Sequence, residues 1–307
     1  MRYPTKSSTR RAFTISRTVT TMVFATAVFL PGVIATTQYS ADKATKEAIL
    51  DILETIDNKA NHVGAHDEDR PFVSLCFAQS LDGKLAMYTD NASADSSSSS
   101  GGAETTVTKK TTSNLAISGP SSLLMTHALR SAHDAILVGG RTLAIDNPRL
   151  SNRLWLSSHS ANQPRPVVLD PYLVHLQALS NRRRARHVIV CYADSVDHKT
   201  LTADYVNDVT FLPCRTTKDG HLDLTDVLVK LKRRHRIQRL MVEGGPSVLG
   251  MFVKANFFDC LCVTVAPKIF GDGLSILEPC DLSTGDVRLH RFDNDICLLA
   301  FPPFQKP

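Results

Sequence analysis

The sequence lacks the short motifs that identify the commonest hydrolases, kinases and zinc enzymes. It contains no G-x-S-x-G, no H-E-x-x-H and no Walker lysine motif. The zinc-deaminase pattern is also absent, because neither Pro213-Cys214 nor Pro279-Cys280 is extended to P-C-x-x-C. None of the seven cysteines forms a C-x-x-C pair, which argues against a zinc site and against dithiol redox chemistry. No bound metal is expected.

Acidic residues are missing from the first part of the chain, where the first carboxylate is Asp42. The basic residues that precede it account for the formal net charge of +5 of the whole chain. The remainder is near neutral, which gives no charge-based argument for binding nucleic acid. Two basic runs, 182–184 and 230–236, are interpreted as a solvated loop and a helix C-terminus.

Residues 1–41 differ from the rest and are interpreted as a basic and apolar leader. Their apolar run, 19–34, is shorter than the roughly 20 residues that a membrane helix needs, and it contains threonine and proline. A targeting or secretory segment is therefore favoured over a membrane anchor, and a tail without function is the third interpretation. Membrane contact, if any, is expected only through 19–34. Most cysteines lie in apolar runs, which favours a reducing compartment, either the cytoplasm or an organelle.

Three further segments follow the leader. Residues 42–70 are predicted to form an amphipathic helix and a polar linker, because the apolar positions 44, 48, 49, 52, 53 and 56 share one helical face. Residues 71–307 are expected to form the main domain. Within it, 88–113 is serine-rich and low in complexity, which predicts a flexible insertion in a surface loop.

Strands and helices alternate along the main domain. This order predicts an α/β fold with a mostly parallel central sheet and helices on both faces. The last two strands follow each other without a helix, so an antiparallel C-terminal edge is expected. Strands are predicted at 72–78, 135–138, 166–169, 187–192, 209–212, 239–242, 260–266 and 296–301. Helices are predicted at 118–131, 173–179, 224–234 and 247–255.

Two of the predicted strands end at glycine pairs. One is followed by Glu243, Gly244 and Gly245 and then by a helix-like run, and the other by a polar stretch from Gly139 to Asp146. Such a turn lets the backbone approach a phosphate, and the helix N-terminus then offers unpaired N–H groups. Two such turns in one α/β chain suggest a dinucleotide lying across neighbouring strand ends. Taken alone, each turn is better explained as a simple loop.

Other polar side chains lie just beyond strand ends or beside these turns. Ser80, Asp82 and Lys84 follow the first strand of the main domain, where a plain hairpin turn is the alternative interpretation. Arg130 and Arg153 flank the polar stretch and could each bind a phosphate with two hydrogen bonds, although both are also compatible with solvated surface arginines. His127, three residues before Arg130, is expected on the helix surface.

Six motifs occur in order between residues 71 and 303 and resemble those of the riboflavin-pathway pyrimidine reductases. These are the stand-alone 2,5-diamino-6-ribosylamino-4(3H)-pyrimidinone 5′-phosphate reductases of fungi and archaea, related to the reductase half of the bacterial bifunctional deaminase–reductase. The motifs are residues 72–84, Met125 to Arg130, Asp134 to Leu150, Arg165 to Asp170, Val242 to Gly245 and Ala266 to Gly271.

The resemblance implies a dihydrofolate-reductase-like fold, NADPH as cofactor, a phosphorylated small-molecule substrate and a homodimer. NADPH would be held by Gly139, Thr142, Asp146 and the turn of Gly244, Gly245, Pro246, Ser247 and Val248. The substrate would face Arg130, Leu150, Arg153 and Glu243.

The implied reaction reduces the ribosyl side chain to a ribityl chain, by hydride transfer to C1′ of the ring-opened imine. Ring opening needs a proton donor, expected to be Lys84, and a charge partner for it, expected to be Glu243. Two alternatives are a reductase of the same fold acting on another pyrimidine or pterin, and a non-catalytic binding protein of that fold. The sequence does not distinguish NADPH from NADH, or the diamino pyrimidine from its deaminated form.

Overall fold

The computed structural model describes residues 41–64, 69–89, 111–113, 116–155, 163–180, 187–197, 209–276, 278–283 and 285–303. The predicted leader, apart from its last residue, and the centre of the predicted insertion, 90–110, lie outside these ranges. The expectations for both segments therefore stay predictions. None of the helices in the described ranges is long and apolar enough to cross a membrane.

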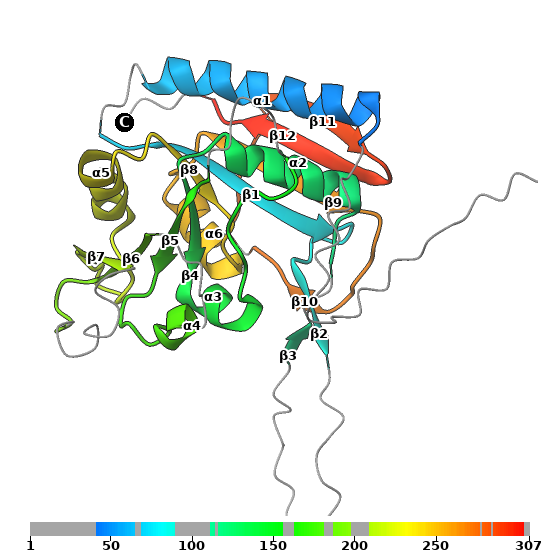
Figure 1. The fold of residues 1–307 in the computed structure, drawn as a ribbon. Coiled ribbons are helices and arrows are strands. Elements are labelled where there is room, and N and C mark those ends of the chain that lie inside the picture. The colour runs from blue at the N-terminus through cyan, green and yellow to red at the C-terminus, as the bar shows by residue number, and fades with distance from the viewer. Residues whose placement is uncertain are drawn as a thin grey trace, which may run out of the picture. The chain divides into compact units, whose positions relative to one another are not determined.

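A nine-stranded sheet forms the centre of the fold, in the order β11-β12-β9-β1-β8-β4-β5-β6-β7 (Figure 1). The strands from β9 to β7 pair in parallel, whereas β12 runs antiparallel to β9, and β11 antiparallel to β12. Their bounds are β1 Phe72–Ser80, β4 Ala135–Gly139, β5 Arg165–Leu169, β6 Val188–Ala193, β7 Val209–Cys214, β8 Arg239–Val242, β9 Cys260–Ala266, β11 Asp286–Phe292 and β12 Asp295–Phe301. The predicted parallel sheet with an antiparallel C-terminal edge is confirmed, and the edge contains one strand, β11, that the sequence analysis missed.

Helices cover both faces of this sheet, as predicted. On one face lie α1 Lys43–Gly64, α2 Pro120–Ser131, α3 Gly140–Asp146 and α4 Gln177–Ser180. On the other face lie α5 Leu224–His235 and α6 Pro246–Lys254. Strands β4 and β6 are buried along their whole length, as expected for central parallel strands covered on both sides, and this explains their uninterrupted apolar sequences.

Two short segments differ from the sequence expectation because of local polar contacts. The predicted helix at 173–179 is reduced to α4, since the Asp170 carboxylate accepts the N–H groups of Val174 (3.2 Å) and His175 (2.8 Å). Leu173 also has a left-handed φ of 57°, which a right-handed helix does not accommodate. Conversely, the expected polar loop after β4 forms the short helix α3, which ends at Asn147 with φ 40°.

A second, three-stranded sheet has the order β10-β2-β3. It contains β2 Ala86–Thr89, β3 Thr111–Ser113 and β10 Gly273–Leu274. Since β2 pairs with β3 in antiparallel fashion, both ends of the predicted insertion are strands rather than loop. The first strand of this small sheet starts two residues after Lys84, so the sheet borders the candidate site.

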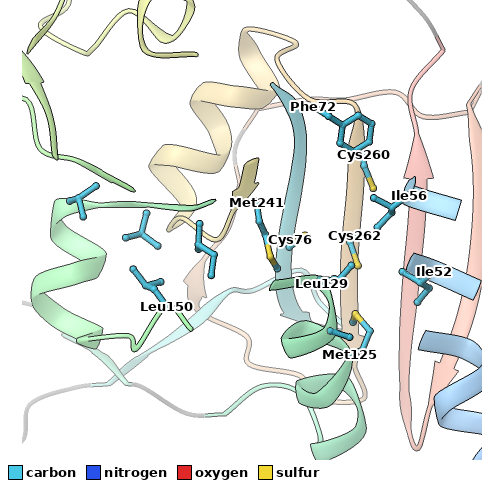
Figure 2. Close-up of a cluster of buried hydrophobic side chains, with 14 of the residues drawn as sticks. Ile52, Ile56, Phe72, Cys76, Met125, Leu129, Leu150, Met241, Cys260 and Cys262 are labelled. Carbon is cyan, nitrogen blue, oxygen red and sulfur yellow. The ribbon is translucent and has the colours of Figure 1, made fainter. Parts of the chain in front are cut away.

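The first helix is part of the main hydrophobic core. Figure 2 shows Ile52 and Ile56 of α1 on the same side of the sheet as Met125 and Leu129 of α2. The helix predicted within residues 42–70 is therefore confirmed as α1, which extends to Gly64. The cluster also contains buried cysteines of β1, β9 and β12, all of them free thiols.

We expect Ile52→Ala to destabilise the protein. The Ile52 side chain is fully buried between α1 and the sheet, and removing its methyl groups leaves a cavity that costs about 2–5 kcal/mol. Chemical denaturation followed by circular dichroism measures the change. Leu50→Ala on the exposed side of the same helix (55% exposed) is the matched control, and an equal loss in both variants would contradict the assignment of the buried face.

Candidate functional site

The two glycine turns lie side by side, because β4 and β8 are parallel neighbours whose carboxyl ends face the same edge of the sheet. A Cβ atom on Gly139 would lie 3.0 Å from Cγ2 of Val248, and one on Gly244 would lie 2.6 Å from its Cβ. A Cβ on Gly245 would lie 3.1 Å from the Thr142 hydroxyl oxygen. The missing side chains therefore let the turns pack together, rather than only opening the backbone to a ligand as the sequence suggested.

The N-terminus of α6 points out of this packed junction. Gly245 is the N-cap residue, no side chain caps the helix, and Pro246 occupies the first turn. Ser247 is exposed, whereas Val248 is buried against the glycines. The free N–H groups and the partial positive charge of such a terminus suit a phosphate group. Asp146, the last residue of α3, is exposed.

Arg130 and Glu243 form a buried ion pair beside these turns. The guanidinium of Arg130, in the last turn of α2, donates from Nε (2.7 Å) and Nη2 (2.6 Å) to the two carboxylate oxygens of Glu243, directly after β8. The two side chains are only 12% and 14% exposed. Burial alone would lower the pKa of Arg130, but the charge and hydrogen bonds of Glu243 outweigh it and raise that pKa above its ordinary value.

The charge partner of Glu243 was predicted to be Lys84, and this detail is corrected by the structure. The carboxylate is bound on both oxygens by Arg130, while the Lys84 ammonium donates instead to the hydroxyl of Ser275 at 3.1 Å. An arginine matches a carboxylate with two parallel hydrogen bonds, which a lysine cannot provide.

A tight turn holds Lys84 at the end of β1. The hydroxyl of Ser80 accepts the backbone N–H of Lys84 (2.9 Å) and donates to the Asp82 carboxylate (2.6 Å). Asp82 also accepts the N–H groups of Phe270 and Gly271, so it joins two loops. These hydrogen bonds, that of Ser80 first, lower the pKa of Asp82 to about 2. The turn therefore does more than reverse the chain: it fixes the backbone that carries the lysine.

The loop after α3 carries the other predicted substrate residues. Leu150 is buried with a left-handed φ of 44°, and the side chain of Arg130 donates to the carbonyl of Ser151 at 3.2 Å. Arg153 is exposed at the end of this stretch. Partial burial, and then the charges of Arg149 and Arg130, lower its pKa, which shows that three arginines gather here.

Two neighbours of the site were not assigned to it from the sequence. Ser275 contacts Lys84 from the far end of the chain, and no local pattern marks it. His127 was expected on the helix surface but is fully buried, and its Nδ1 accepts the backbone N–H of Arg153 at 2.9 Å. The spacing of three residues between His127 and Arg130 places both on one helix face, and it is the sequence feature that could have assigned His127 to the site.

Among the described residues, no group of three or more His, Cys, Asp or Glu could hold a metal ion.

The comparisons with known proteins agree with this architecture. The family described as "RibD C-terminal domain" matches residues 71–298. The 2,5-diamino-6-ribosylamino-4(3H)-pyrimidinone 5′-phosphate reductase of Kluyveromyces marxianus is 28% identical over 76% of this chain and 88% of its own length. The riboflavin biosynthesis protein RibD of Aquifex aeolicus is 33% identical over 68% of this chain, which corresponds to half of that protein.

A solved structure of the same fold is the riboflavin biosynthesis reductase Rib7 of Saccharomyces cerevisiae. It superimposes with a TM-score of 0.59 at 23% identity, over 82% of this chain and 99% of that one. The dihydrofolate-reductase-like fold expected from the motifs is thereby confirmed. The chain belongs to the family of the RibD C-terminal domain, the reductases of riboflavin biosynthesis.

Proposed function

We propose that this chain reduces the ribosyl side chain of 2,5-diamino-6-ribosylamino-4(3H)-pyrimidinone 5′-phosphate to the ribityl form, with NADPH as hydride donor. The observation that carries the proposal is the junction at the ends of β4 and β8. There Thr142 lies against Gly245, and Glu243 binds Arg130. The names of the curated relatives support the substrate, and the reductase family implies a nicotinamide cofactor.

The residues at the junction fit a dinucleotide. The uncapped N-terminus of α6, with Ser247 exposed, suits one phosphate of the pyrophosphate bridge. Thr142 lies against Gly245, and Asp146 follows it one helical turn later on α3; we propose that their hydroxyl and carboxylate groups form hydrogen bonds with the cofactor. When bound, NADPH would supply the hydride that reduces C1′.

The substrate side of the proposal uses the arginines that gather at the loop after α3. Arg153 and Arg149 bring positive charge to the exposed end of the loop, which suits the dianionic 5′-phosphate. Arg130 is already neutralised by Glu243, so we propose that it holds this carboxylate in place rather than binding the phosphate alone. Leu150 is expected to form the apolar floor between them.

The proposed reaction requires the chain to donate a proton and to stabilise a positive charge. Opening the sugar ring breaks the bond between C1′ and the ring oxygen. The oxygen takes up a proton, and the lone pair of the exocyclic nitrogen forms the C=N bond to C1′, which gives a cationic imine. We propose Lys84 as the proton donor, since its ammonium is held by Ser275 on a rigid turn. The carboxylate of Glu243 would stabilise the cationic imine that develops.

An absorbance assay of NADPH oxidation tests the function directly. The protein is supplied with the diaminoribosylamino-pyrimidinone phosphate, its deaminated analogue, or neither. We expect turnover with the diamino compound. Turnover with only the deaminated compound would move the step after deamination, and NADPH binding without turnover of either would contradict the proposed substrate.

The proposed homodimer has a candidate interface on the C-terminal edge of the sheet. Val287, Leu289 and Ile296 are 44%, 67% and 49% exposed. Strand parity and register place them on the face of β11 and β12 opposite to α1, where they belong to neither core cluster. An exposed, contiguous apolar sheet face of this kind is typical of a subunit interface.

We expect Leu289→Asp to shift the protein from dimer to monomer in analytical ultracentrifugation. A carboxylate placed at the centre of an apolar interface is desolvated without a partner, which costs several kcal/mol of association. Leu50→Asp, on the exposed side of α1, is the control that should leave the mass unchanged. A dimer that survives Leu289→Asp at micromolar concentration would place the interface elsewhere.

A further inference from the structure

We infer that His127 is a positioning residue that fixes the backbone of Arg153 for binding the substrate phosphate, an inference that rests on the proposed function. His127 lies on α2 and has no exposed surface. Its Nδ1 lies 2.9 Å from the backbone nitrogen of Arg153. The imidazole thus reaches from a rigid helix to the loop that carries the exposed arginine.

The direction of this hydrogen bond fixes the chemical state of the imidazole. Because the backbone N–H of Arg153 donates, Nδ1 must be the unprotonated nitrogen, and Nε2 carries the proton of the neutral ring. Burial, followed by the charges of Arg130 and Arg153, lowers the pKa of His127 to about 4. The ring therefore remains a hydrogen-bond acceptor at every pH at which the enzyme would operate.

A second contact from the same helix face supports the loop two residues earlier. Arg130, three residues after His127, donates to the carbonyl of Ser151, so that α2 binds Ser151 and Arg153 at once. Leu150 adopts a left-handed conformation that costs about 1 kcal/mol or more for a residue other than glycine. The loop would relax from this geometry if the two contacts from α2 were lost.

The charges around Arg153 explain why its backbone needs fixing. Partial burial lowers the pKa of Arg153 most, and the charges of Arg149 and Arg130 lower it further. Although Arg130 is paired with Glu243, the guanidinium of Arg153 is therefore held at an electrostatic cost until an anion binds. A flexible loop would let the guanidinium swing toward solvent. A fixed backbone keeps it near the position that the phosphate will occupy, so less ordering is needed on binding.

Paired substitutions at position 127 isolate the hydrogen bond. Asparagine can present an acceptor near the place of Nδ1, whereas leucine fills similar space without one. We expect His127→Leu to raise KM for the phosphorylated substrate about 10- to 100-fold, the range expected when the charge-assisted contact between Arg153 and the phosphate is lost. We expect kcat to change less than about threefold, and His127→Asn to recover most of the affinity.

Three comparisons separate positioning from a general loss of structure. The effects of His127→Leu and Arg153→Met on KM should not add in the double variant, because both act on one interaction. Neither should change KM for the substrate without its 5′-phosphate. His133→Leu replaces another buried histidine near the end of α2, bonded to Leu129 and Ser74, and should lower stability without changing this KM.

Hydrogen exchange of the peptide that contains residues 150–155 gives a readout independent of turnover. We expect faster exchange in His127→Leu and near wild-type protection in His127→Asn. If the His127→Leu variant keeps the wild-type rate and an unchanged KM, the positioning role of His127 is wrong, while the proposed function still stands. Absence of turnover by the wild type would overturn the proposed function on which the inference rests.

Discussion

Glu243→Gln is expected to lower kcat/KM about 100-fold or more and also to destabilise the fold. The loss in rate follows from removing the negative charge that would face the cationic imine, an effect of about 10²–10³ for comparable electrostatic groups. The loss in stability follows from leaving the Arg130 guanidinium buried beside a neutral amide. Breaking a buried ion pair in this way costs about 3–5 kcal/mol. Steady-state kinetics and denaturant unfolding measure the two effects.

The double variant Arg130→Met with Glu243→Leu separates the two effects. Apolar side chains of similar volume remove both charges at once, so the free energy of unfolding should return to within about 1–2 kcal/mol of the wild-type value. The rate should not return, because the carboxylate is still absent. If the double variant recovered activity together with stability, Glu243 would be a structural residue and its proposed role in the reaction would be wrong.

The parts of the fold that the sequence predicted are those in which one local signal dominates. Strands β4 and β6 are uninterrupted apolar runs, and the start of α6 is set by Gly245 and Pro246. Prediction failed where a polar side chain or an exposed edge outweighed the apolar pattern. The apolar run after β5 would make a helix, but the carboxylate of Asp170 binds its N–H groups and leaves only α4. Strand β11 lies at an exposed edge, so its polar side chains concealed it.

In the candidate site, the sequence predicted the positions of single side chains but not their contacts. Strand ends located Lys84, Thr142 and Glu243, because parallel strands bring their carboxyl ends to one edge. Which of these groups contact one another was not predictable. The partners Arg130 and Glu243 are 113 positions apart in the chain, and only the packing of α2 against the sheet brings them together. The expected pairing of Lys84 with Glu243 failed for this reason.

Lys84→Met is expected to reduce kcat about 10²–10⁴-fold, the usual contribution of a general acid. Methionine preserves the length and apolar stem of the side chain but cannot deliver a proton to the ring oxygen. The turn itself should persist, because Ser80 binds the backbone N–H of residue 84 and not its side chain. The dissociation constant for NADPH, measured by fluorescence titration, should therefore change little while the single-turnover rate falls.

The conservative variant Lys84→Arg distinguishes proton delivery from a purely electrostatic role of the ammonium. Arginine keeps the positive charge but does not give up a proton in proteins, so the single-turnover rate should fall in Lys84→Arg nearly as far as in Lys84→Met. Lys268→Met is the matched control, since this exposed lysine only donates to the carbonyl of Ala116. A Lys84→Arg enzyme that kept the wild-type rate would assign the proton to another group. In that case Ser275, whose hydroxyl lies 3.1 Å from the lysine ammonium, is the next candidate donor, and Ser275→Ala would then show the larger loss.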